Sequence, residues 1–136
     1  MKIAEKIQII DRNILADNRG YFLKILTGKE EFLPAYTGEI YLTSAKPNEA
    51  KGGHYHPAAN EWFILLQGEC LLKLFDIATK ESASILLSAD EPKTIFVPNN
   101  IAHIFCNTND KDDFLLLAYT DMHYNPNDTI VFQDFD

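Results

Sequence analysis

The stretch Gly52-Gly53-His54-Tyr55-His56-Pro57-Ala58-Ala59-Asn60-Glu61-Trp62 decides how this chain folds and where its chemistry lies. Side chains alternate between the two faces of a β-strand, so His54 and His56 point to the same face where the segment is extended. Pro57 cannot donate to a strand ladder, and the three residues after it favour a turn. A turn resets the alternation, which lets Glu61 open the next strand with its carboxylate on the side of the two histidines.

A second stretch supplies a fourth polar side chain. Pro98-Asn99-Asn100 is typical of a turn, because Asn tolerates the left-handed conformation better than most residues, and His103 follows in the next expected strand. Three imidazoles and a carboxylate are a ligand set for a divalent transition metal such as Zn, Fe, Mn, Ni or Co. We therefore expect a divalent transition metal of unspecified identity, bound by His54, His56, Glu61 and His103.

The rest of the chain predicts an all-β domain. Short β-rich runs separated by turn residues are typical of a barrel or sandwich, and no repeat or linker divides residues 1–136, so we expect a single domain. Gln67-Gly68-Glu69 is a candidate hairpin turn. One short turn of helix is expected at 29–33. The expected strands are 3–10, 21–26, 39–45, 62–66, 70–75, 84–87, 94–97, 102–106 and 114–119.

The composition of the chain argues against several classes of function. The net charge of −8 argues against binding to nucleic acid, and no apolar run is long enough to predict a membrane-spanning helix. The start of the chain has no apolar segment typical of a secretion signal, and the two cysteines are too few for a disulfide framework. We expect a cytoplasmic protein. An anionic substrate would need a local cationic patch, for which Arg19, Lys46 and Lys51 are the candidates.

The spacing of the polar residues resembles the two motifs of the cupin superfamily. The first is H-x-H, four residues, Glu, six residues and Gly68, and the second is P-x-x-x-x-H-x-x-x-N, from Pro98 to Asn107. The chain departs from those motifs at Asn48 and Asn100, where cupins usually have glycine. The resemblance implies a cupin-type double-stranded β-helix, which is a jelly-roll barrel.

Further segments resemble the cupins that act on nucleotide sugars. Asp17-Asn18-Arg19-Gly20-Tyr21-Phe22 is similar to the D-x-R-G-x-F segment of the dTDP-4-dehydrorhamnose 3,5-epimerases, and Lys51-Gly52-Gly53-His54-Tyr55 to their R-G-x-H-Y motif. The tail from Tyr124 to Ile130 resembles their Y-x-P-x-x-E-x-I ending. The paired histidines also resemble the R-G-x-H-A-H of the dTDP-sugar 3,4-ketoisomerases and the H-x-H of the cupin domain of capsule-synthesis reductases.

This resemblance implies an isomerase or epimerase of a nucleotide-linked keto-sugar, in the biosynthesis of surface polysaccharide or deoxysugars. The base of the epimerases falls on His54, and a catalytic tyrosine falls one residue from Tyr119. Those epimerases have Gln at the place of His56 and Arg at the place of Lys51, so 3,5-epimerisation itself is not expected. The substrate-binding candidates are Arg19, Lys51 and Tyr41.

Two assignments of the base stay open at this stage, because a histidine bound to a metal cannot also accept a proton. With a metal in the barrel, the base is Tyr119, Tyr41 or His123. Without one it is His54 or His56, and Lys51 or a tyrosine stabilises the substrate oxygen.

Two other functions remain as alternatives, a metal-dependent cupin oxygenase and a non-catalytic cupin that binds a sugar or a metal. Strands that are apolar on both faces need cover on both sides. For that reason we also expect a homodimer, with the strand at 3–10 as the candidate for pairing with the partner.

Overall fold

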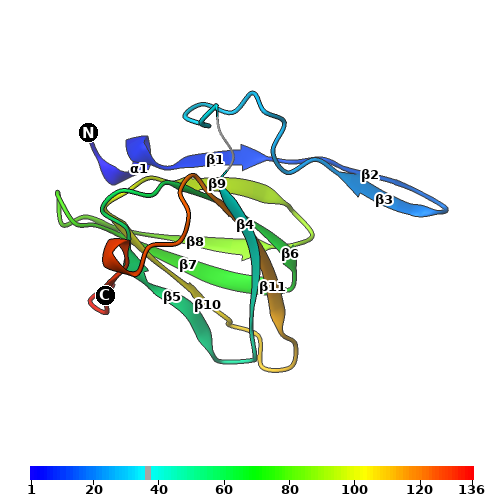
Figure 1. The fold of residues 1–136 in the computed structure, drawn as a ribbon. Helices are drawn as coiled ribbons and strands as arrows, with labels where there is room; N and C mark the ends of the chain where they lie inside the picture. Colours follow the sequence, from blue (N-terminus) through cyan, green and yellow to red (C-terminus); the bar gives the residue numbers. More distant parts are fainter. Residues whose placement is uncertain (36–37) are drawn as a thin grey trace.

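The computed structural model describes residues 1–35 and 38–136, and nearly all of its regular structure is β (Figure 1). Two five-stranded antiparallel sheets face each other, in the strand orders β1-β9-β6-β11-β4 and β12-β5-β10-β7-β8. This is the expected jelly-roll barrel. The strands are β1 (Gln8–Asp11), β2 (Ile14–Asp17), β3 (Gly20–Leu23), β4 (Glu39–Ala45), β5 (Ala50–Tyr55), β6 (Glu61–Gln67), β7 (Glu69–Asp76), β8 (Ser82–Ser88), β9 (Lys93–Val97), β10 (Ile101–Cys106), β11 (Phe114–Thr120) and β12 (Ile130–Val131).

The core lies between the two sheets and follows from the alternation along each strand. On β6, Phe63 and Leu65 point inward to the main apolar cluster, whereas Trp62 points outward. Gly68 joins β6 to β7 with a φ of 87°, as expected for the hairpin turn. Asn100 has a φ of 62°, which is the left-handed conformation expected in the turn before β10.

The outer face of β6 is covered by a segment of the same chain rather than by another sheet. Leu26 and Leu33 pack on the cluster of Trp62, Phe96 and Tyr119. A second set of contacts fastens this segment, because the Arg12 guanidinium donates to the Glu30 carboxylate at 2.5 Å and to the Thr94 hydroxyl at 3.0 Å. In turn, the Thr94 hydroxyl donates to the carbonyl of Ile25.

The ends of some elements differ from the sequence-based expectation. Residues expected as a strand at 3–10 form α1 (Ile3–Lys6) and then β1, since the backbone N–H of Lys2 donates to the Glu5 carboxylate and Ile3 is buried. No helix forms at 29–33, where Phe32 has a left-handed φ of 70°. Besides α1, the described residues form the single 3₁₀ turn η1 (Pro126–Asp128). No helix in the described ranges is both long and apolar enough to cross a membrane.

Strands β2 and β3 form a hairpin of their own that projects from the barrel (Figure 1). Its strands pair only with each other among the described elements. The apolar side chains of Leu15, Tyr21 and Phe22 are 64%, 69% and 57% exposed. The hairpin therefore leaves an apolar surface uncovered within one copy of the chain.

Candidate active site and metal centre

A glycine-dependent bulge brings the first two imidazoles together. His54 on β5 is the register partner of His103 on β10, and the register shifts immediately afterwards, where Gly52 pairs with Ile104. Gly52 has a φ of 100°, and a Cβ there would lie 2.8 Å from the carbonyl oxygen of His103. Residues directly opposite each other share a face of the sheet, so His54 and His103 both point into the barrel.

The turn from His56 to Glu61 brings a carboxylate from the facing sheet. Two buried aspartates hold this turn. Asp128 accepts hydrogen bonds from the backbone N–H groups of Ala58 and Ala59, and Asp121 accepts from the backbone and side chain of Asn60. Glu61 begins β6 with only 3% of its surface exposed. As expected, the turn after Pro57 changes the alternation of side chains, so that Glu61 faces the same side as the histidines.

The four side chains converge at one point inside the barrel. Glu61 Oε1 lies 3.0 Å from His56 Nε2 and 3.5 Å from His103 Nε2. The ligand nitrogens of His54, His56 and His103 all lie within 4.8 Å of one another. The predicted convergence is thus seen.

This cluster fits a divalent transition metal. His56 Nε2 and Glu61 Oε1 are buried and, within the described part of the chain, neither makes a hydrogen bond of acceptable geometry despite their close approach. Ligand atoms at about 2.0–2.2 Å from one metal are themselves about 3.0–3.5 Å apart. Two buried, unpartnered ligand atoms at that spacing are what a shared cation would satisfy.

Hydrogen bonds to other parts of the chain orient the candidate metal ligands. His56 Nδ1 lies 2.9 Å from the carbonyl oxygen of Asp128, and His103 Nδ1 lies 3.3 Å from that of Ile101. A carbonyl oxygen only accepts, so each Nδ1 carries the proton and each Nε2 faces the cluster. The Tyr41 hydroxyl donates to Glu61 Oε2 at 2.8 Å. Metal ligands in proteins are commonly held by such contacts.

The pKa values of the three histidines in the cluster are shifted in different directions. Burial and the neighbouring imidazoles of His103 and His56 lower the pKa of His54 to about 4. Burial also lowers the pKa of His103, against the opposing effect of Glu61. Burial disfavours a charged His56, but Glu61 and Asp128 outweigh it and raise the pKa of His56. Burial likewise opposes ionisation of Glu61, but His56, His103 and Tyr41 lower its pKa.

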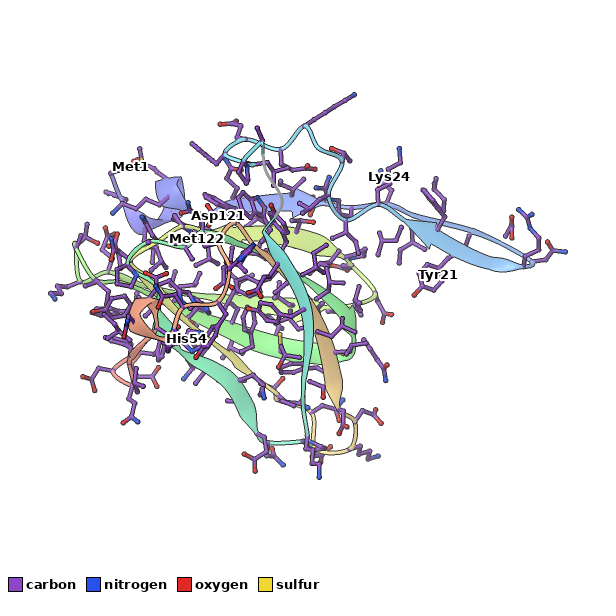
Figure 2. The ribbon with its side chains drawn as sticks, viewed as in Figure 1. Met1, Tyr21, Lys24, His54, Asp121 and Met122 are labelled. Carbon is purple, nitrogen blue, oxygen red and sulfur yellow. The ribbon has the colours of Figure 1, made fainter. Side chains whose placement is uncertain are left out.

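A cavity of about 560 Å³ opens beside the cluster. One wall is the segment from Thr120 to Thr129, and Figure 2 shows Met122 of this segment on the same side of the barrel as His54. No lysine or arginine is among the described residues that line the cavity. Its lining residues are Glu39, Ile40, Tyr41, His54, His56, Ala59, Glu61, Thr120, Met122, His123, Tyr124, Asn125, Asp128 and Thr129.

The structure brings some of the predicted site residues together and leaves others apart. Tyr41 and His123 line the cavity together with His54 and His56. Tyr119 does not, because it pairs with Trp62 and lies with that residue on the outer face of the sheet. Its hydroxyl accepts a hydrogen bond from the backbone N–H of Gly38. A one-residue shift along β11 thus separates Tyr119 from the cavity.

The cationic candidates also lie outside the cavity of their own chain. Arg19 is at the tip of the projecting hairpin, where its side chain is 86% exposed and pairs with Asp17. Lys46 and Lys51 are exposed and do not line the cavity. Figure 2 shows Tyr21 of the hairpin, and Lys24 just after it, on the opposite side of the molecule from His54.

Sequence reasoning missed Asp121 and Asp128. Both carboxylates act on a turn more than sixty residues earlier in the chain, and no local pattern reveals such a contact. The available hint was that Asp128 lies in the tail segment that resembles the nucleotide-sugar enzymes.

The barrel and its inward cluster of three histidines and one glutamate define a cupin. The sequence profile described as "Polysaccharide biosynthesis C-terminal domain" matches residues 15–132, and this chain belongs to that family. A search of curated proteins finds no match.

Solved structures with the same fold include a dTDP sugar isomerase from Desulfovibrio desulfuricans G20, at a TM-score of 0.84 and 19% identity over 95% of this chain and 85% of that chain. A dTDP-6-deoxy-D-glucose-3,5-epimerase from Legionella pneumophila Philadelphia 1 matches at 0.85 and 18%, over 99% and 77%. A 3,4-ketoisomerase from Helicobacter canadensis matches at 0.75 and 26%, over 91% and 89%. These similarities confirm the predicted fold and the resemblance to nucleotide-sugar cupins.

Proposed function

We propose that this chain is an isomerase or epimerase of a nucleotide-linked keto-sugar, acting in polysaccharide or deoxysugar biosynthesis. The observation that carries the proposal is the convergence of His54, His56, Glu61 and His103 beside a cavity. The family described for polysaccharide biosynthesis supports it, as does the similarity to a 3,4-ketoisomerase and a dTDP sugar isomerase. The cytoplasm, where we expect the protein, is part of the same proposal.

We also propose that the cluster binds a divalent transition metal. The buried Nε2 of His56 and Oε1 of Glu61 support this, because they lie 3.0 Å apart and, in the described part of the chain, form no hydrogen bond of acceptable geometry. When bound, such a metal supplies positive charge next to a ketone oxygen. Imidazole and carboxylate ligands leave Zn, Fe, Mn, Ni and Co as candidates.

The proton transfer itself requires a base among the protein's own residues. Isomerisation next to a ketone removes a proton from one carbon and returns a proton to the same or a neighbouring carbon. With His54, His56 and His103 as ligands, His123 on the cavity wall is the proposed base, since imidazole most often has this role. Tyr41 is less suited, because burial and the Glu61 carboxylate raise its pKa and keep the hydroxyl protonated.

A homodimer would complete the site. A nucleotide diphosphate is anionic, yet no lysine or arginine lines the cavity among the described residues. Each copy also carries a projecting hairpin with exposed Leu15, Tyr21 and Phe22. A two-stranded hairpin is marginal in water without cover, so we infer that a second copy covers it and receives Arg19 at its cavity.

The experiment that tests the function is solvent exchange. The protein is incubated in D₂O with a dTDP-4-keto-6-deoxy sugar, and deuterium at the carbons next to the ketone is measured by mass spectrometry and proton NMR. We expect enzyme-dependent incorporation with and without oxygen, and its loss in His123→Ala.

Two outcomes would overturn the proposal. Oxygen consumption without deuterium exchange indicates the alternative metal-dependent oxygenase. Binding of the sugar nucleotide, seen as a thermal shift, with no exchange in the metal-loaded protein indicates a non-catalytic cupin.

A further inference from the structure

Asp128 contacts the site segment through both its side chain and its backbone. Its two carboxylate oxygens accept from the N–H groups of Ala58 at 2.8 Å and Ala59 at 3.0 Å. Its carbonyl oxygen lies 2.9 Å from Nδ1 of His56. Asp128 is buried, with 8% of its surface exposed, although it lines the cavity.

These three contacts act on one short stretch of chain. The carboxylate fixes the turn that follows His56, and that same anchoring fixes where the Asp128 carbonyl lies relative to the imidazole. The carbonyl accepts only from a protonated Nδ1, which leaves Nε2 directed at Glu61 Oε1, 3.0 Å away. The η1 turn also holds Asp128, since the backbone N–H of Asp128 donates to the carbonyl of Asn125 at 2.9 Å.

We propose that Asp128 is the positioning residue of the site and sets the ring orientation and the protonated nitrogen of His56. Although Asp128 lines the cavity, both of its carboxylate oxygens are already occupied by the backbone N–H groups of Ala58 and Ala59. It acts through His56, and it links the cavity wall between Thr120 and Thr129 to the centre of the cluster. The proposal rests on the proposed function for its significance, but its main test needs neither metal nor substrate.

Asp121 provides a matched control. It is equally buried, it binds the same turn through the backbone and side chain of Asn60, and among the described residues it forms no hydrogen bond or ion pair with an imidazole. Replacing Asp121 loosens the turn without removing the anchor of His56. A difference between Asp128→Ala and Asp121→Ala therefore separates positioning of His56 from general support of the turn.

The test is ¹H–¹⁵N NMR of the histidine rings in the metal-free protein. Nδ1 of His56 carries a proton both in the imidazolium and in the neutral tautomer that the carbonyl contact assigns, so its exchange with water reports the bond to the Asp128 carbonyl in either protonation state. We expect a slowly exchanging Nδ1–H in the wild-type protein. Exchange should be at least about tenfold faster, or the resonance lost, in Asp128→Ala and unchanged in Asp121→Ala.

Unchanged exchange in a folded Asp128→Ala protein would overturn the proposal, and so would an equal loss in Asp121→Ala. If Asp128→Ala does not fold, Asp128→Asn replaces it, because the amide keeps one acceptor oxygen. We expect intermediate exchange for that variant, and wild-type exchange would count against the proposal. A supporting measurement is Zn²⁺ affinity by chelator competition, expected to fall about 10- to 100-fold in Asp128→Ala only. If no protein binds Zn²⁺, the metal proposal fails while the NMR result still decides the role of Asp128.

Discussion

His54 on β5 lies directly opposite His103 on β10, and the bulge at Gly52 makes this pairing possible. A side chain at Gly52 would meet the carbonyl of His103 at 2.8 Å in a backbone conformation that L residues rarely adopt. The two imidazoles therefore depend on a position that has no side chain.

The first prediction concerns this glycine. Gly52→Ala should lower the free energy of unfolding by about 2–4 kcal/mol, because strain at positive φ and a backbone clash add together. Gly53→Ala is the control, since Gly53 also has a positive φ but its nearest contact is at 3.6 Å. Urea denaturation should show the larger loss for Gly52→Ala, and equal losses would contradict the bulge as its cause.

The second prediction concerns metal content. Protein purified without a histidine tag should contain about one divalent transition metal per chain by elemental analysis, and His103→Ala should contain almost none. His123→Ala lies on the cavity wall outside the ligand cluster, so it should keep the metal. Metal-free wild-type protein that also fails to take up added Zn²⁺, Fe²⁺, Mn²⁺, Ni²⁺ or Co²⁺ would return the role of base to His54.

The third prediction concerns Tyr41. Removing its hydroxyl frees Glu61 Oε2 from a 2.8 Å hydrogen bond, so Tyr41→Phe should weaken metal binding about 10-fold while the protein stays folded. Competition with a chelator measures the affinity, and circular dichroism checks the fold. Wild-type affinity in Tyr41→Phe would mean that Glu61 does not depend on this contact.

The fourth prediction concerns acid stability. Burial opposes ionisation of Glu30, but hydrogen bonds from Arg12 and Thr27 lower its pKa to about 2 from an ordinary 4.5. A carboxyl group with a lowered pKa stabilises the fold above its unfolded pKa, and this contribution is lost as the pH falls from about 4.5 towards 2. Glu30→Gln should therefore be less stable than wild type by about 1–3 kcal/mol at pH 7, with the gap closing near pH 2.

An exposed pair gives the control for Glu30. Asp11 pairs with Lys93 at 2.9 Å, but the Asp11 side chain is 82% exposed. Asp11→Asn should change the stability by less than about 1 kcal/mol at pH 7. A gap for Glu30→Gln that stays constant between pH 7 and pH 2 would show that its cause is not ionisation.

The fifth prediction concerns the hairpin. If a second copy covers it, Phe22→Asp should shift the protein from dimer to monomer in analytical ultracentrifugation without unfolding the barrel. Leu86→Asp is the control, because Leu86 is 70% exposed on β8, away from the hairpin. A wild-type protein that sediments as a monomer at high concentration would exclude the proposed dimer.

Local patterns predicted the parts of the fold that local chemistry determines. β4 has the bounds expected from the sequence, and the left-handed turn at Asn100 was predicted from the tolerance of asparagine for that conformation. The convergence of the three histidines and Glu61 was also predicted, because the alternation along a strand and the turn at Pro57 act over a few residues. Short-range rules were sufficient to place His54, His56 and Glu61 on one side, whereas the meeting with the distant His103 was expected from the spacing that resembles the cupin motifs.

Features that depend on long-range packing were not predicted. Tyr119 was a catalytic candidate, but the β11 register places it with Trp62 on the outer face, and register is a property of the pairing rather than of the local sequence. The cover over Trp62 by Leu26 and Leu33 joins an irregular segment to a distant strand. The residues expected as a strand at 3–10 begin as a helical turn because Ile3 is buried against the barrel.

His54 and His103 belong to one sheet, His56 directly follows β5 of that sheet, and Glu61 begins a strand of the other. A metal ion bound by these side chains would cross-link the two sheets. Occupation of the centre should then resist any motion that parts the sheets, so loading the protein would stiffen the whole barrel and not only its mouth. The thermal stability of the barrel and its catalytic activity would then depend on the same metal–ligand bonds.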